Sequence, residues 1–241
     1  MQNAQLLLNP LLHLVVILPL LLFFIKGHTR ENYLRVLSIV VCTFLYSFAL
    51  YIPYLFSLLR IIDGSWNWSG KLYGIACGIM LYLLFRRQFD DNNFFTLKQN
   101  KEGLKSSIIV AVALLSFYIL AGLLVRAEFD VETLLFQLLM PGIDEEIMYR
   151  GVLLGLMCST LRGVGEPLRT PAVIINGIWF GLAHSLAFRN GGVAFSIVPF
   201  IAASLAGYAL SYIGLRTRSI FIPMLTHALC NFCNNLMSMI L

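Results

Sequence analysis

Apolar runs long enough to cross a bilayer occupy most of this 241-residue sequence. A bilayer core about 30 Å thick needs roughly 20 apolar residues per spanning helix. Only 12% of the residues are charged and 59% are apolar, with a mean hydropathy of +0.82. This composition excludes a disordered chain, a secreted disulfide scaffold and a nucleic-acid-binding protein, because a soluble chain could not cover so much apolar surface. Eight runs are found, at residues 5–25, 36–58, 70–85, 106–125, 143–160, 171–188, 193–215 and 219–241. The sequence therefore predicts an all-α, polytopic membrane helix bundle of about eight transmembrane helices.

Basic residues are divided unevenly between the two ends of the predicted bundle. Twelve Lys and Arg lie in alternate loops, and the remaining loops contain four, at Arg60, Lys71, Arg126 and Arg189. Because cytoplasmic loops are enriched in Lys and Arg, both chain termini are expected outside. The excess of basic residues behind the net charge of +5 is therefore interpreted as setting the orientation of the protein in the membrane. The small size and short loops favour a multi-pass protein of a bacterial cell membrane.

The first group of ionisable residues inside the apolar runs is PGIDEEIMYRG, residues 141–151. Such residues are costly in a bilayer and mark functional sites. Asp144 is expected near the start of the fifth helix, where the helix dipole favours an acid. Glu146 and Arg150 are four residues apart and are predicted to pair on one helix face. Glu145 points about 100° away and is expected to have no partner, which leaves it free to exchange a proton with water.

Two further groups lie on the sixth and eighth apolar runs. In NGIWFGLAHSL, His184 follows Phe180 by one helical turn. In FIPMLTHALCNF, His227 and Asn231 are four residues apart and lie side by side, where their donors could bind a developing oxyanion.

The remaining polar and small residues are given structural interpretations. The repeat Gly70, Gly74, Gly78 predicts close packing of a neighbouring helix. Cys230 and Cys233 form a CxxC, which could be a redox pair or a soft-metal site, but small buried thiols at helical spacing favour a role in packing. Residues 128–140 are predicted to form a separate amphipathic helix at the membrane interface.

The three polar groups could offer a carboxylate, two imidazoles and an amide to one buried cavity. This set of groups can hydrolyse a peptide bond. Glu145, His184 and His227 could equally be zinc ligands, and the residues alone do not decide between metal and no metal. A buried Glu, Arg and His set could also form the relay of a proton- or ion-coupled transporter, although no repeated halves support that reading.

The chain resembles the CPBP family, the CAAX proteases and bacteriocin-processing enzymes related to the Ras-converting CAAX endopeptidase. Its motifs EExxxR, FxxxH and HxxxN occur here in the family's order, and the likeness extends over residues 141–235. The matching residues are Glu145-Glu146-Ile147-Met148-Tyr149-Arg150, Phe180-Gly181-Leu182-Ala183-His184 and His227-Ala228-Leu229-Cys230-Asn231.

The resemblance implies an intramembrane endopeptidase in which Glu145 activates water and His184 holds it. It also implies that His227 and Asn231 form the oxyanion site, with Glu146, Arg150 and Phe180 as supporting residues. Residues 126–241 would be the catalytic core, and residues 1–125 would be accessory helices.

No obligatory cofactor is expected from the resemblance, although a zinc-dependent protease using Glu145, His184 and His227 stays an alternative. The expected partners are the lipid bilayer and a membrane-associated peptide or protein, either a prenylated CAAX-type substrate or a bacteriocin- or pheromone-like peptide. A non-catalytic protein, such as a bacteriocin-immunity factor, is the remaining alternative, and no nucleic-acid partner is expected.

Overall fold

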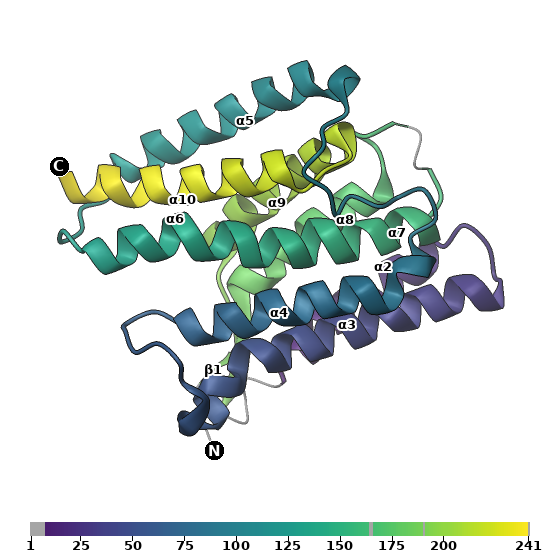
Figure 1. The fold of residues 1–241 in the computed structure, drawn as a ribbon, viewed down its shortest axis with the longest axis horizontal. Coiled ribbons are helices and arrows are strands. Elements are labelled where there is room, and N and C mark those ends of the chain that lie inside the picture. The colour runs from purple at the N-terminus through teal and green to yellow at the C-terminus, as the bar shows by residue number, and fades with distance from the viewer. Residues whose placement is uncertain (1–7, 164–165, 190, 241) are drawn as a thin grey trace.

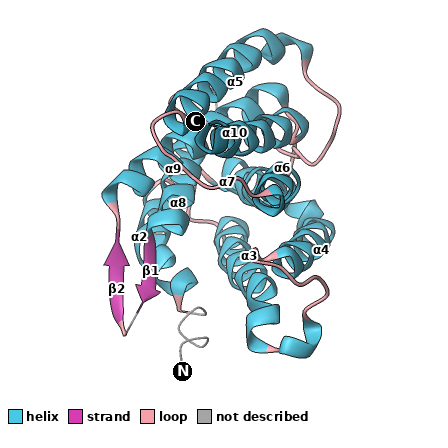
Figure 2. Ribbon diagram, turned by 90° about the vertical axis from the view of Figure 1, so that its left-hand side faces the viewer, coloured by secondary structure: helices cyan, strands magenta, loops and turns pink. Residues whose placement is uncertain are grey.

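The helices of the computed structural model, which describes residues 8–163, 166–189 and 191–240, pack in two layers (Figures 1 and 2). One layer contains, side by side, α5 (Lys101–Gly122), α10 (Phe221–Ile240), α6 (Val131–Glu146), α4 (Trp68–Phe85) and α3 (Arg30–Leu55). The other contains α9 (Ile197–Thr217), α8 (Pro171–Ser185) and α2 (Asn9–Phe23). Single turns of 3-10 helix, η1 (Ser57–Leu59) and η2 (Arg86–Gln88), flank α4. The predicted all-α membrane bundle is confirmed.

Each predicted apolar run contains a helical segment, but the segments differ in their capacity to span a bilayer. Within the described residues, four helices are long and apolar enough to do so, at residues 30–55, 68–88, 101–122 and 197–217. Helix α2 is apolar, but its 15 residues are fewer than the roughly 20 that a spanning helix needs.

A small β-hairpin is the exception to the helical architecture. It consists of β1 (Leu186–Arg189) and β2 (Gly192–Phe195), which pair antiparallel directly after α8. The start of α2 holds the outer edge of β1. The Phe188 N–H donates to Asn9 Oδ1 at 2.9 Å, and His13 Nε2 donates to the Leu186 carbonyl at 2.9 Å. The apolar run predicted to be helical to residue 188 therefore ends its helix at Ser185.

The central helix is longer than predicted. Helix α6 continues through a π-helical segment, η3 (Ile147–Leu153), into α7 (Leu154–Thr160). The side chain of Asp130 caps this helix, and its hydrogen bonds, led by that from the Thr133 hydroxyl, hold the pKa of Asp130 below its ordinary value. The expectation of a separate interfacial helix followed by a new helix near residue 143 is wrong, because Pro141 lies inside one continuous helix.

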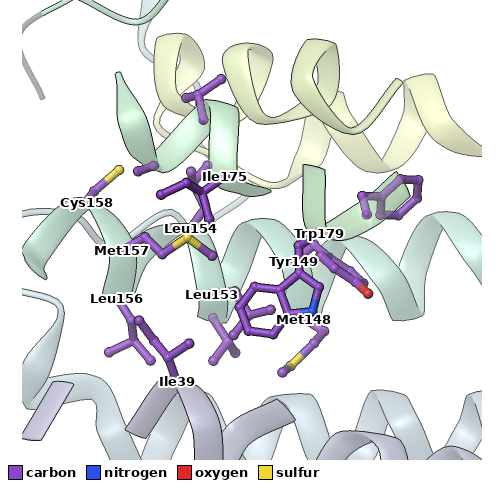
Figure 3. Packing of buried hydrophobic residues seen from close by; sticks show 14 of the residues in the cluster. Ile39, Met148, Tyr149, Leu153, Leu154, Leu156, Met157, Cys158, Ile175 and Trp179 are labelled. Carbon is purple, nitrogen blue, oxygen red and sulfur yellow. The ribbon is translucent and has the colours of Figure 1, made fainter. Parts of the chain in front are cut away.

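The apolar core surrounds the second half of this helix (Figure 3). Leu153, Leu154, Leu156 and Met157 point in all directions and are all essentially inaccessible to solvent. They pack against α3 and α8, and Trp179 is the largest fully buried side chain of this core. A helix that is apolar all round is buried all round, so the segment that follows Glu145 and Glu146 is held firmly in place.

The glycine repeat on α4 allows this helix to approach α6 closely. A Cβ at Gly74 would overlap the Asp144 carboxylate, and a Cβ at Gly78 would overlap Ile147. The predicted packing role of the repeat is confirmed. The same close approach brings other residues of α4 within reach of the acidic motif on α6.

The loop between α3 and α4 is fastened to the start of α6. The Glu132 carboxylate accepts hydrogen bonds from the Ser65 N–H at 2.9 Å, the Trp66 N–H at 3.3 Å and the Trp68 indole at 3.0 Å. We call this side of the bundle the hairpin end, defined by residues 56–67, 123–130 and the β-hairpin.

Candidate active site

Three helices bring the predicted motif residues together. Glu145 comes from α6, His184 from the last turn of α8 and His227 from α10. The Oε2 atom of Glu145 lies 3.9 Å from His184 Nε2 and 4.0 Å from His227 Nε2. Two imidazole nitrogens therefore face one carboxylate oxygen.

A fully buried ion pair lies directly behind this group. Arg150 Nη1 donates to Glu146 Oε1 at 2.7 Å, and both side chains are inaccessible to solvent. The predicted pairing is confirmed. Arg150 also donates to the Gly207 carbonyl at 2.9 Å, and His227 Nδ1 donates to the same Glu146 oxygen at 2.7 Å. Glu146 thus fixes the orientation of His227, and Arg150 fixes Glu146.

Phe180 fills the space between the charged residues and the imidazoles. The Arg150 guanidinium lies 4.8 Å from the centre of its ring, at a distance suited to a cation–π contact. The rings of His184 and His227 lie 4.4 and 5.7 Å from the same centre. Phe180 therefore positions both imidazoles by packing.

Lys71 was not predicted as a site residue, and its position corrects two expectations. Its ammonium Nζ lies 2.6 Å from Glu145 Oε1 and 2.8 Å from Asp144 Oδ2. The expectation that Glu145 has no partner is therefore wrong. Lys71 also lies in the first turn of α4 with its side chain largely buried, so it does not belong to the loop charges. The sequence contains a usable signal, since Lys71 stands beside Gly70 and one turn before Gly74, on the face that packs against another helix.

Asp144 is also placed differently from its predicted position. It lies in the interior of the continuous helix and is fully buried, so the helix dipole does not explain it. The Tyr46 hydroxyl of α3 donates to Asp144 Oδ2 at 2.7 Å, and Lys71 donates to the same oxygen. Asp144 thus connects the acidic motif to α3 and α4.

Two cavities meet at Glu145, Lys71 and His184. The larger, with a volume of about 510 Å³, extends toward the hairpin end and is also lined by His227 and Asn231. The smaller, of about 150 Å³, lies between α2, α3 and α8 and is lined by residues that include His13. All four predicted catalytic residues therefore border the larger cavity.

Within the described part of the chain, no group of three or more His, Cys, Asp and Glu side chains is placed to hold a metal ion. The gaps of 3.9 and 4.0 Å from Glu145 to the imidazole nitrogens exceed the roughly 3.4 Å that tetrahedral zinc with bonds near 2.1 Å would set between its ligands. Lys71 also places a positive charge against Glu145. As they stand, these donors do not fit a zinc site.

Comparison with protein families bears on the C-terminal part of the chain. Residues 127–233 match the family model described as Type II CAAX prenyl endopeptidase Rce1-like. This segment is therefore similar to the Rce1-like CAAX protease family, and the resemblance found from the three motifs is confirmed. The family and the apolar helices together make this an integral membrane protein. Lys71 lies outside the matched segment.

No curated protein and no solved structure matches the chain.

Removing Arg150 should destabilise the protein strongly. Arg150→Ala leaves Glu146 buried without its cation, a change that typically costs about 3–5 kcal/mol. Thermal unfolding of the purified protein in detergent measures this loss. Arg169→Ala is the matched control, because its pair with Glu166 is exposed and its atoms are 4.0 Å apart, so no measurable change is expected. Equal melting temperatures for the two variants would contradict the structural role of Arg150.

Proposed function

We propose that this protein is an intramembrane endopeptidase that hydrolyses a peptide bond of a membrane-associated peptide or protein, with Glu145 as the base that activates water. The observation that carries the proposal is that the two carboxylate oxygens of Glu145 have different surroundings. Lys71 binds Oε1, while Oε2 is buried, accepts no hydrogen bond from the described residues and faces two imidazoles. One oxygen is thereby held in place, and the other is available for chemistry.

The protonation of His184 follows from its contacts. His184 Nδ1 lies 2.8 Å from the Phe180 carbonyl oxygen, which can only accept, so Nδ1 carries the hydrogen. In the neutral ring Nε2 is therefore an acceptor. A water molecule between Glu145 Oε2 and His184 Nε2, 3.9 Å apart, can donate one hydrogen bond to each at normal length. Its lone pairs then point away from both acceptors, toward a substrate carbonyl.

His227 and Asn231 are suited to stabilising an oxyanion. His227 Nδ1 donates to the Glu146 carboxylate, so its Nε2 carries a hydrogen when the ring is an imidazolium paired with that carboxylate. Asn231 lies one turn further along α10 on the wall of the same cavity, and its side-chain amide makes no hydrogen bond with the described residues. The two groups can offer N–H donors to one oxygen atom.

The reaction then proceeds in two steps, addition of water to the carbonyl carbon and cleavage of the C–N bond. Water transfers a proton to Glu145 Oε2 while its oxygen bonds to the carbonyl carbon, and the carbonyl π electrons move onto the oxygen that His227 and Asn231 hold. The oxyanion re-forms the C=O bond as the C–N bond breaks. The proton on Glu145 passes to the leaving nitrogen, and Glu145 returns to its carboxylate form.

The candidate substrates come from the family, and the proposed location comes from the apolar runs, the small size and the short loops. A prenylated CAAX-type protein and a bacteriocin- or pheromone-like peptide are the candidate substrates, and a multi-pass position in a bacterial cell membrane is the proposed location. We also propose that catalysis needs no metal, which the spacing of the donors and the Lys71 ammonium favour.

Glu145→Gln should lower cleavage by about 10² or more, because the amide keeps the shape of the side chain but cannot take a proton. Asn231→Ala should lower kcat roughly 10²- to 10³-fold by removing one oxyanion donor. The assay is cleavage of a fluorogenic decapeptide library by the purified protein in detergent. If the wild-type protein cleaves no peptide but transports protons or ions in vesicles, the protease proposal is wrong.

Lys71→Met should reduce kcat by more than tenfold, because Glu145 loses the contact that fixes Oε1. In Lys71→Met, Asp144 and Glu145 both lose their cation. The double variant Lys71→Met/Asp144→Asn removes one of these two unpaired charges, so it should be more thermally stable than Lys71→Met but should not regain kcat. Lys71→Arg keeps the charge and should keep more activity than Lys71→Met. A double variant with wild-type kcat would mean that Lys71 only balances the charge of Asp144.

Exhaustive treatment with a zinc chelator should leave peptide cleavage unchanged. The purified protein is assayed before and after chelation and again after zinc is added back. Activity that disappears with the chelator and returns with zinc would overturn the metal-free mechanism, while the protease assignment would stand.

A further inference from the structure

A stripe of polar side chains runs along α10 beyond the motif residues. His227, Asn231 and Asn235 are spaced four residues apart, and all three line the larger cavity. Gln137 on the neighbouring helix α6 also lines this cavity. Asn235 lies outside the segment that matches the family model, and neither Asn235 nor Gln137 belongs to a recognised motif.

These amides have unused hydrogen-bonding capacity. The side chain of Gln137 makes no hydrogen bond with any described residue, and Asn235 uses its Nδ2 to donate to the Asn231 carbonyl at 2.8 Å, which leaves its Oδ1 free. Pro141, which lines the same cavity, has no N–H to bond the Gln137 carbonyl one turn earlier. Both donors and acceptors are therefore available in this part of the cavity.

The spacing of the stripe matches an extended peptide. Four residues of α-helix rise about 6 Å, and two residues of an extended strand rise about 6.6 Å. A strand lying beside α10, with its scissile carbonyl at His227 and Asn231, would thus present a further backbone group to Asn235. The stripe is about 12 Å long, enough for roughly three to four strand residues. Ser65 and Trp66, in the loop that hydrogen-bonds to Glu132, line the same cavity at the hairpin end.

We propose that Asn235 and Gln137 form a subsite that binds the main chain of the substrate in an extended conformation, over three to four residues on the hairpin-end side of the scissile bond. This inference rests on the proposed function. Amides offer both donors and acceptors, so they pair with peptide N–H and C=O groups whatever the side chains are. The subsite therefore selects for an unfolded segment of sufficient length and tolerates variation in sequence.

The test compares substrate lengths. A fluorogenic decapeptide that the wild-type protein cleaves is shortened one residue at a time from each end, and KM and kcat are measured for every peptide. Asn235→Ala and Gln137→Leu should each raise KM about 3- to 10-fold, the scale of one lost hydrogen bond, with kcat nearly unchanged. The effect should vanish for peptides shortened from one particular end, because those peptides no longer reach the subsite.

Asn234→Ala is the matched control on the same helix. Its amide donates to the Tyr118 carbonyl of α5 at 2.9 Å, away from the polar stripe, so this variant should lower thermal stability without changing the length dependence. If Asn235→Ala and Gln137→Leu raise KM equally for all peptide lengths, or not at all, the subsite is wrong even though the protein is a protease. If the wild-type protein cleaves no peptide, the proposed function fails first.

Discussion

The compensation of buried charge is the constraint on which the rest of this structure depends. Asp144, Glu145 and Glu146 occupy consecutive positions in the interior of a largely apolar bundle, where an uncompensated carboxylate is very costly. Lys71 meets the first two, and Arg150 meets the third. The two cations approach from different helices, and one oxygen of Glu145 accepts no hydrogen bond from any residue that the structure describes. Charge compensation thus also leaves open the atom that we propose takes the proton from water.

The backbone makes this compensation possible. Glycines on α4 let that helix approach α6 closely enough for Lys71 to reach both acids. Gly207 on α9 has the same effect for Arg150, because a Cβ there would overlap Phe180, whose ring lies under the guanidinium. The apolar segment after the acidic motif then fixes the central helix against α3 and α8. Small residues set how closely the helices approach, and large apolar residues prevent them from moving.

The amphipathic character of the larger cavity links the site to its proposed substrate. Its walls include the Glu145 carboxylate, the imidazoles of His184 and His227, the amides of α10 and α6, and aromatic rings such as those of Trp66 and Tyr118. A peptide bond has to enter an apolar environment without losing its hydrogen bonds, because each unpaired polar group is costly there. A cavity lined by amides provides those bonds while the surrounding helices remain apolar.

The sequence by itself determined the fold class, the family resemblance and the three motifs, because apolar length and four-residue spacing are local properties of a chain. It also predicted the Glu146–Arg150 pair, since both residues lie on one helix. Lys71, Tyr46 and the true position of Asp144 needed the tertiary structure. Lys71 and Glu145 are 74 residues apart, and only the packing of α4 on α6 brings them together. The start of the central helix was missed because Pro141 is a local signal for a helix boundary, which the surrounding tertiary structure overrides.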